Sequence, residues 1–155
     1  MKMPNRIRRK SQQAFSLIEV LFGIFLAGMC ATILAATMPV ANNSRLKANN
    51  QNAALSIAQK QVEVLRSIGY PNLTADRLYA SGVIDSTTPL ATDTYSFTNI
   101  DAGVYDSPSL KLPSGQGRLT IEQVGIDLRR VTIQLIWIES GRTKSVRLGT
   151  MVANL

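Results

Sequence analysis

The chain has 155 residues, which is enough for one folded domain and one membrane-spanning helix. Its formal net charge is +7, but a basic leader within the first fourteen residues, where no acid occurs, supplies five of the cations: Lys2, Arg6, Arg8, Arg9 and Lys10. Twelve Lys and Arg then face ten Asp and Glu, so the rest of the chain is nearly neutral and does not argue for nucleic-acid binding. The absence of histidine and the single cysteine, Cys30, exclude a serine–histidine catalytic pair and an intrachain disulfide.

An apolar segment at residues 15–41 follows the basic leader. Residues 20–44 contain no ionisable side chain apart from Cys30, and the segment exceeds the roughly 20 residues with which a helix crosses a bilayer. We therefore predict that it is a transmembrane helix half. By the positive-inside rule, the cations of the leader predict that residues 1–14 stay in the cytoplasm and that the rest of the chain is exported.

Two kinds of cleaved signal fit this segment less well. A secretory signal has an apolar region of only about 7–15 residues before a small-residue cleavage site, and Leu34-Ala35-Ala36 is a poor match to such a site. A lipoprotein signal needs small residues directly before a cysteine, whereas Met29 precedes Cys30. A retained helix with a processing site at its cytoplasmic start is the remaining interpretation.

Residues 14–19, Ala-Phe-Ser-Leu-Ile-Glu, place one carboxylate, Glu19, near the start of the apolar segment. A charged side chain at the centre of a spanning helix costs about 2.5–3.5 kcal/mol on insertion scales, and such residues usually have a partner. The order of basic leader, small residue, aromatic residue, Leu-Ile-Glu-Val and apolar helix resembles the class III signal of type IV pilins and pseudopilins. The resemblance covers about residues 8–29 and places the acid at the fifth position after the cut that it implies.

This resemblance implies roles for three residues. A membrane prepilin peptidase would cut between Ala14 and Phe15 and methylate the new amino terminus at Phe15. The family usually has Gly before the cut, where this chain has Ala14. In pilin filaments the acid pairs with the amino-terminal charge of a neighbouring subunit, which implies an assembly role for Glu19. Such pairing in a low-dielectric helix bundle would relieve the cost of burying either charge alone.

An amphipathic helix half is predicted at residues 42–68, beyond the apolar segment. Apolar side chains at spacings of three and four share one face: Leu55, Ala58, Val62, Leu65 and Ile68. Charged side chains fall largely on the other side: Arg45, Lys47, Lys60, Glu63 and Arg66. Gly69 followed by Tyr70-Pro71 is a stop signal, so one helix is expected over about 15–68. Pro39 is expected to kink or loosen it because it removes a backbone donor.

A globular head is predicted at residues 69–155. Alternating and β-branched runs indicate strands, which we expect at 95–100, 118–124, 131–138 and 143–152. Ser140-Gly141 is expected to form the turn of a hairpin, and the apolar helix stripe is expected to cover the face that carries Val131, Ile133, Leu135 and Trp137. The expected fold class is therefore α+β and, by resemblance, pilin-like: a long N-terminal helix, transmembrane in its first half, packed on a C-terminal antiparallel sheet.

The sequence contains few residues that could act in catalysis or bind a metal ion. The loop acids Asp93, Asp101 and Asp106 match no EF-hand spacing, and we interpret them as solvated. Cys30 is interpreted as a small apolar residue. We expect no catalytic residue, no metal site and no cofactor, and hence no enzyme.

A basic cluster is expected in or beside the C-terminal hairpin: Arg129, Arg130, Arg142, Lys144 and Arg147. DNA capture would use such a patch to neutralise phosphates. A solvated sheet face, on which Lys and Arg discourage edge-to-edge pairing, is the simpler interpretation, and nucleic acid is an unlikely partner but not an excluded one.

Three functions follow from these patterns. The helix end Val62-Glu63-Val64-Leu65-Arg66, the disulfide-free head and Ile136-Trp137 before a tight hairpin look like the minor pilin and minor pseudopilin branch, whose members initiate or cap a type IV pilus or a type II secretion pseudopilus. Implied partners are other pilin or pseudopilin subunits, the prepilin peptidase and an inner-membrane assembly platform, and the implied location is the bacterial inner membrane, then the filament. The alternatives are a competence-filament component that captures DNA through basic head residues and a signal-anchored periplasmic module without a filament role.

Overall fold

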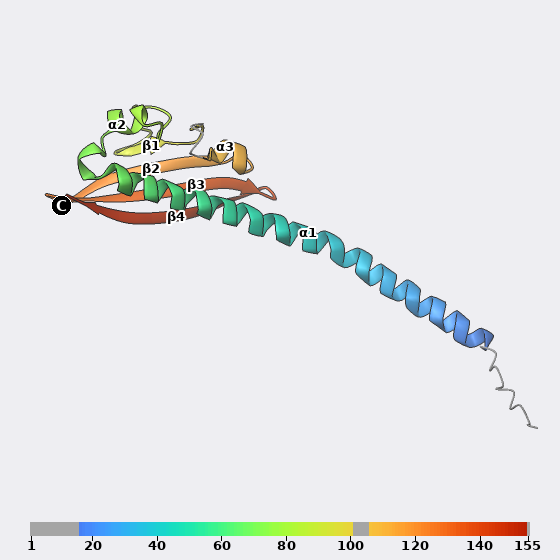
Figure 1. Cartoon of the computed structure of the whole chain (residues 1–155). Helices are drawn as coiled ribbons and strands as arrows, with labels where there is room; N and C mark the ends of the chain where they lie inside the picture. The colour runs from blue at the N-terminus through green and yellow to red at the C-terminus, as the bar shows by residue number, and fades with distance from the viewer. Residues whose placement is uncertain (1–15, 101–105, 155) are drawn as a thin grey trace, which may run out of the picture. The chain divides into compact units, whose positions relative to one another are not determined.

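The computed structural model describes residues 16–100 and 106–154, and the chain divides into two compact units, Met1–Asn43 and Ser44–Leu155 (Figure 1). One helix, α1 (Leu17–Ile68), contributes to both units. The second unit adds the helices η1 (Tyr70–Asn72), α2 (Ala75–Ala80) and α3 (Pro108–Lys111) and the strands β1 (Thr94–Ser96), β2 (Gln116–Gly125), β3 (Leu128–Glu139) and β4 (Arg142–Ala153). The expected α+β arrangement is confirmed.

The described part of the first unit consists of the first half of α1. Among the described residues, α1 is the one helix with a stretch long and apolar enough to span a membrane, and none of that stretch is buried. Pro39 lies inside the helix, where its ring cannot donate the backbone hydrogen bond that other residues make. Length and composition therefore agree with the predicted spanning segment.

The sheet of the second unit is antiparallel, in the order β1-β2-β3-β4. The strands predicted at 118–124, 131–138 and 143–152 are confirmed and extend slightly further at both ends. Ser140 and Gly141 join β3 to β4 with φ values of 50° and 73°. A two-residue hairpin turn with both φ values positive matches the right-handed twist of the strands, so the predicted turn is also confirmed.

β1 is shorter than the strand predicted at 95–100, because a carboxylate draws the chain out of the sheet. Asp85 accepts hydrogen bonds from the Ser96 hydroxyl at 2.6 Å, from the Thr98 amide at 2.7 Å and from the Asn99 amide at 2.9 Å. These donors no longer extend the ladder. The alternation of apolar and polar residues that predicted a strand continues into a loop that Asp85 organises.

The core lies between the second half of α1 and one face of the sheet (Figure 1). The helix buries Ala54, Ile57, Ala58, Gln61, Val62 and Leu65. The sheet supplies buried side chains from three strands: Leu119, Val131, Ile133, Leu135, Trp137 and Val152. The predicted packing of the helix on the face that carries Val131 and Trp137 is confirmed.

The buried helix face differs from the predicted one. Leu55 is 41% exposed and Ile68 is only partly buried, whereas Ala54, Ile57 and Gln61 are buried instead. Successive residues lie about 100° apart around a helix, so Leu55 falls at the margin of a face centred on the alanines. The helix buries small and large side chains of this face against the sheet and leaves Leu55 partly exposed.

Leu65 and Leu55 form a matched pair for testing this packing. Leu65→Ala should cost about 2–5 kcal/mol of unfolding free energy, because it empties a fully buried site. Leu55→Ala should cost less than about 1 kcal/mol. Urea unfolding of a fragment that begins at Ser44, which we expect to fold alone, would measure both. Equal and small losses would show that the helix stripe is not part of the core.

Candidate functional site

The sequence places its candidate site at the start of the chain. The predicted cleavage and methylation residues, Ala14 and Phe15, lie outside the described residues. The described part begins at Ser16, whose carbonyl accepts hydrogen bonds from the amides of Glu19 at 2.9 Å and Val20 at 3.2 Å. Ser-x-x-Glu is a sequence pattern typical of helix starts, and Glu19 lies in the first turn of α1.

Glu19 has no ion-pair partner among the residues that the structure describes. The next cation along α1 is Arg45, which lies roughly 39 Å further along a helix with a rise of about 1.5 Å per residue. A cation that neutralises Glu19 within the apolar region therefore has to come from the segment before the helix or from another molecule. Either source is compatible with the role that the resemblance implies.

The surface around Glu19 is apolar and uncovered by the described residues of its own chain. The exposed side chains include Leu17, Ile18, Val20, Leu21, Phe22, Ile24 and Phe25. Cβ atoms added at Gly23 and Gly28 would meet nothing within 4 Å, so the surface beside both glycines is open to a neighbouring helix. Soluble monomers rarely expose contiguous apolar surface of this extent. This exposed apolar half, together with its length and composition, is consistent with membrane anchoring.

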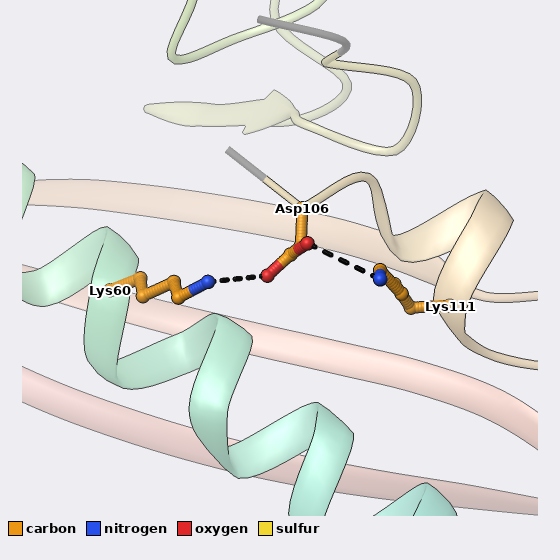
Figure 2. A network of polar contacts seen from close by, with 3 residues as sticks. All are labelled: Lys60, Asp106 and Lys111. Carbon is orange, nitrogen blue, oxygen red and sulfur yellow. Dashed lines mark hydrogen bonds and ion pairs between the residues drawn. The ribbon is translucent and has the colours of Figure 1, made fainter. Parts of the chain in front are cut away.

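The head contains one charged network (Figure 2). Asp106 lies between Lys60 of α1 and Lys111 of α3, at 2.6 Å and 3.6 Å respectively. Asp106 was expected to be a solvated loop acid, but it joins two elements of the head. The hydrogen bond from Lys60 is the main cause that holds the pKa of Asp106 below its usual value, and the charges of Lys60 and Lys111 add to it.

The other loop acids of interest do not join this network. Asp93 adopts a positive φ of 52°, and its carbonyl accepts the Ile121 amide at 2.9 Å. Asp101 lies outside the described residues. Within 16–100 and 106–154, no group of three or more acidic or cysteine side chains is placed to hold a metal ion.

The predicted basic cluster is divided between two faces of the sheet. Arg129 points toward the helix side, where its guanidinium lies 4.5 Å from the centre of the Tyr70 ring. It donates to the carbonyls of Tyr70 at 3.2 Å and Leu73 at 2.7 Å. Arg129 therefore holds the chain after α1, a role that sequence reasoning missed.

The remaining cations of the predicted cluster are also divided between the two faces and the two ends of the sheet. Arg130 follows Arg129 in the strand, so it faces the other side of the sheet, where it pairs with Glu122 at 3.6 Å. Arg142 and Lys144 stand opposite Glu139 and Trp137 at the turn end of the sheet. Residue parity along β3 could have predicted that Arg129 and Arg130 face opposite sides of the sheet.

The comparisons with known proteins identify one segment. Residues 9–35 match the family described as the prokaryotic N-terminal methylation motif, which is the signal of type IV pilins and pseudopilins. No curated protein and no solved structure matches the chain. The resemblance inferred from the residues around Glu19 is confirmed, and the chain carries a pilin-type signal at its start.

The Asp106 network has a defined pH dependence. Because its pKa is lowered in the folded state, the stability that Asp106 contributes is present above its ordinary value of 3.8 and is lost as the pH falls through the lower, folded value. Lys60, Lys111 and Asp106 are 50%, 57% and 31% exposed, so the contribution should be on the order of 0.5 kcal/mol. Urea unfolding of wild type and Asp106→Asn should show a difference that disappears in acid and shrinks in high salt.

Lys60→Ala should have an effect of the same sign as Asp106→Asn but smaller, because the pair with Lys111 remains, and Lys47→Ala serves as the matched control. Lys47 is an exposed lysine of the same helix and makes none of the described ion pairs. A difference that stays constant from neutral to strongly acidic pH would show that Asp106 contributes through packing and not through charge.

Proposed function

We propose that the chain is a minor pilin-like structural subunit that initiates or caps a type IV pilus or a type II secretion pseudopilus. The observation that carries the proposal is the pilin-type signal at residues 9–35, which leads directly into an apolar helix half with no cover from the described chain. A filament of packed helices would supply that cover. The disulfide-free head and the Ile136-Trp137 strand end before the tight hairpin support the minor branch.

The proposed organisation has four parts. Residues 1–14 are a cytoplasmic leader that is removed, 15–41 are the transmembrane helix half, 42–68 are the amphipathic half, and 69–155 complete a periplasmic head. The protein first resides in the bacterial inner membrane as a single-pass protein and then passes into the filament. Its partners are the prepilin peptidase, an inner-membrane assembly platform and other pilin or pseudopilin subunits.

Glu19 is the proposed assembly residue. After cleavage, the amino group of Phe15 would carry a positive charge at membrane depth. Pairing it with Glu19 of an adjacent subunit would neutralise both charges in a low-dielectric bundle. Because one buried polar pair is satisfied in only one axial position, it would also set the register of neighbouring helices, as a single buried polar residue does in coiled coils.

The role proposed is structural and not enzymatic, and two alternatives remain. DNA capture by a competence filament would need a basic head surface, and the separation of Arg129, Arg130 and Arg142 across the sheet does not favour it. A signal-anchored periplasmic module without a filament role is distinguished by retention of the leader.

The first expected outcome concerns processing. Mass spectrometry of the protein purified from membranes should show loss of residues 1–14 and a methylated Phe15. In cells that lack the prepilin peptidase the same protein should keep its leader. An intact Met1 in cells with an active peptidase would contradict the proposal.

The second expected outcome concerns assembly. Glu19→Ala should leave membrane insertion and cleavage intact but should impair recovery of the protein in sheared filaments, because the register-setting charge pair is lost. Glu63→Ala, which removes an exposed acid from the other half of α1, is the matched control and should assemble normally. A subunit at the filament tip has no subunit ahead of it, so crosslinking to the next subunit is the second readout. Wild-type levels of both would overturn the role of Glu19.

A further inference from the structure

Three contacts fix the direction of β3 along the second half of α1. Arg129, at the start of β3, bonds to the carbonyl of Tyr70 just after the helix. Further back along the helix, Arg66 donates to the Thr150 hydroxyl of β4 at 3.0 Å. Still nearer the apolar segment, Asn50 donates to the Glu139 carboxylate, at the end of β3, at 3.3 Å. The β3–β4 turn therefore lies at the end of the head from which α1 continues toward the apolar segment.

This end of the head is strongly basic. Its exposed cations, which we call the basic end, are Arg45, Lys47, Arg142 and Lys144. Lys47 lies one helical turn before Asn50 and on the same side of the helix, and Arg142 and Glu139 are direct partners across the hairpin. Glu139 is the acid that lies among these cations, and its carboxylate already accepts a hydrogen bond from Asn50.

The opposite end of the head shows no such excess. Around η1, α2 and the β2–β3 turn, Arg77 and Arg129 are accompanied by Asp76 and Asp127. The head is therefore electrically polarised along its length, although the chain after the leader is almost neutral as a whole. The overall composition of the chain does not explain why the cations gather at one end of the head.

The chain itself limits how far the basic end can be from the membrane. Only four residues separate Ala41, at the end of the apolar segment, from Arg45, and nine separate Ala41 from Asn50. Within a helix these intervals span about 6 Å and about 14 Å. Attraction between Lys or Arg and an anionic membrane surface acts over about one Debye length, roughly 8–10 Å. Measured along the chain, Arg45 therefore lies within that range of Ala41, and Asn50 lies just beyond it.

We propose that the basic end docks the head on anionic phospholipid headgroups while the subunit resides in the membrane. Arg45 and Lys47 would contact the headgroups directly, and Arg142 and Lys144 would bring the hairpin turn down to the surface. The proposal rests on membrane anchoring through α1 and not on the proposed filament role. It assigns to Arg142 and Lys144 a function at the lipid surface and not at a nucleic acid.

A fluorescence experiment on the full chain tests this proposal. Cys30 is the only cysteine, so a Cys30→Ser background accepts one dye at Thr143→Cys, beside the β3–β4 turn, or at Ile126→Cys, in the exposed β2–β3 turn. The protein is reconstituted in nanodiscs that carry acceptor-labelled lipid. Discs of equal parts phosphatidylglycerol and phosphatidylcholine are compared with discs of phosphatidylcholine alone.

Energy transfer from position 143 should rise in the anionic discs and fall again in about 0.5 M salt. Energy transfer from position 126 should not rise in the anionic discs. Each cation near an anionic surface contributes about fivefold to binding, so Arg142→Gln with Lys144→Gln should lower the ratio of docked to undocked heads about 25-fold. The control pair Arg77→Gln and Arg118→Gln removes the same charge from other exposed positions and should change nothing.

Two results would overturn the inference. One is equal transfer in the two kinds of disc, and the other is wild-type transfer from the Arg142→Gln, Lys144→Gln variant when its urea midpoint shows that it is folded. If the first result is accompanied by binding of a short DNA duplex that this variant loses, the cations would be assigned to nucleic acid. Glu19→Ala should dock like wild type, so failure of the filament role and failure of lipid docking are separately visible.

Discussion

A single continuous helix has to bury its surface in two different surroundings, and the rest of the structure depends on this requirement. The backbone of α1 satisfies its own hydrogen bonds throughout, which is what permits a helix to enter hydrocarbon. Its apolar side chains, in contrast, need other groups to cover them. From Ala54 to Leu65 the sheet of the same chain covers them, whereas from Leu17 to Asn43 no described residue does. The first half therefore needs other molecules, and the second half supplies the stability with which the head folds.

The sheet contributes its apolar face to the packing against α1, and the direction of β3 decides which polar side chains of the sheet meet the helix. Because β3 runs back along α1, the hairpin turn reaches the helix near Asn50, and the start of β3 anchors the chain after Ile68 through Arg129. Asp106 adds ion pairs that link Lys60 of α1 to Lys111 of α3. These contacts involve helix positions far apart in the sequence, so the helix and sheet act as one body within the second unit.

Much of this fold could be predicted from local patterns, and the errors arose where long-range contacts decide. The three longer strands and the Ser140-Gly141 turn follow from β-branched runs and from turn chemistry. The helix face could not be placed to within one residue, because the burial of Ala54, Ile57 and Gln61 in place of Leu55 is decided by packing against the sheet. The roles of Asp85 and Asp106 carried no sequence signal, since the partners of Asp85 lie 11 to 14 residues away and Lys60 lies 46 residues from Asp106. Phe97 packs where a Cβ of Gly117 would lie, 2.6 Å from its ring, and that contact is equally non-local.

The cations on the two sides of the apolar segment are unequal in number. The five cations of the leader outnumber the two that follow the segment closely, Arg45 and Lys47, so the positive-inside rule still favours a cytoplasmic start. The cations beyond the segment gain their effect from folding, because the hairpin returns Arg142 and Lys144 to the same level as Lys47. Surface cations of this kind contribute about 1 kcal/mol each and are screened by salt. A contact of that strength would orient a head on the membrane and, because salt screens it, would remain reversible.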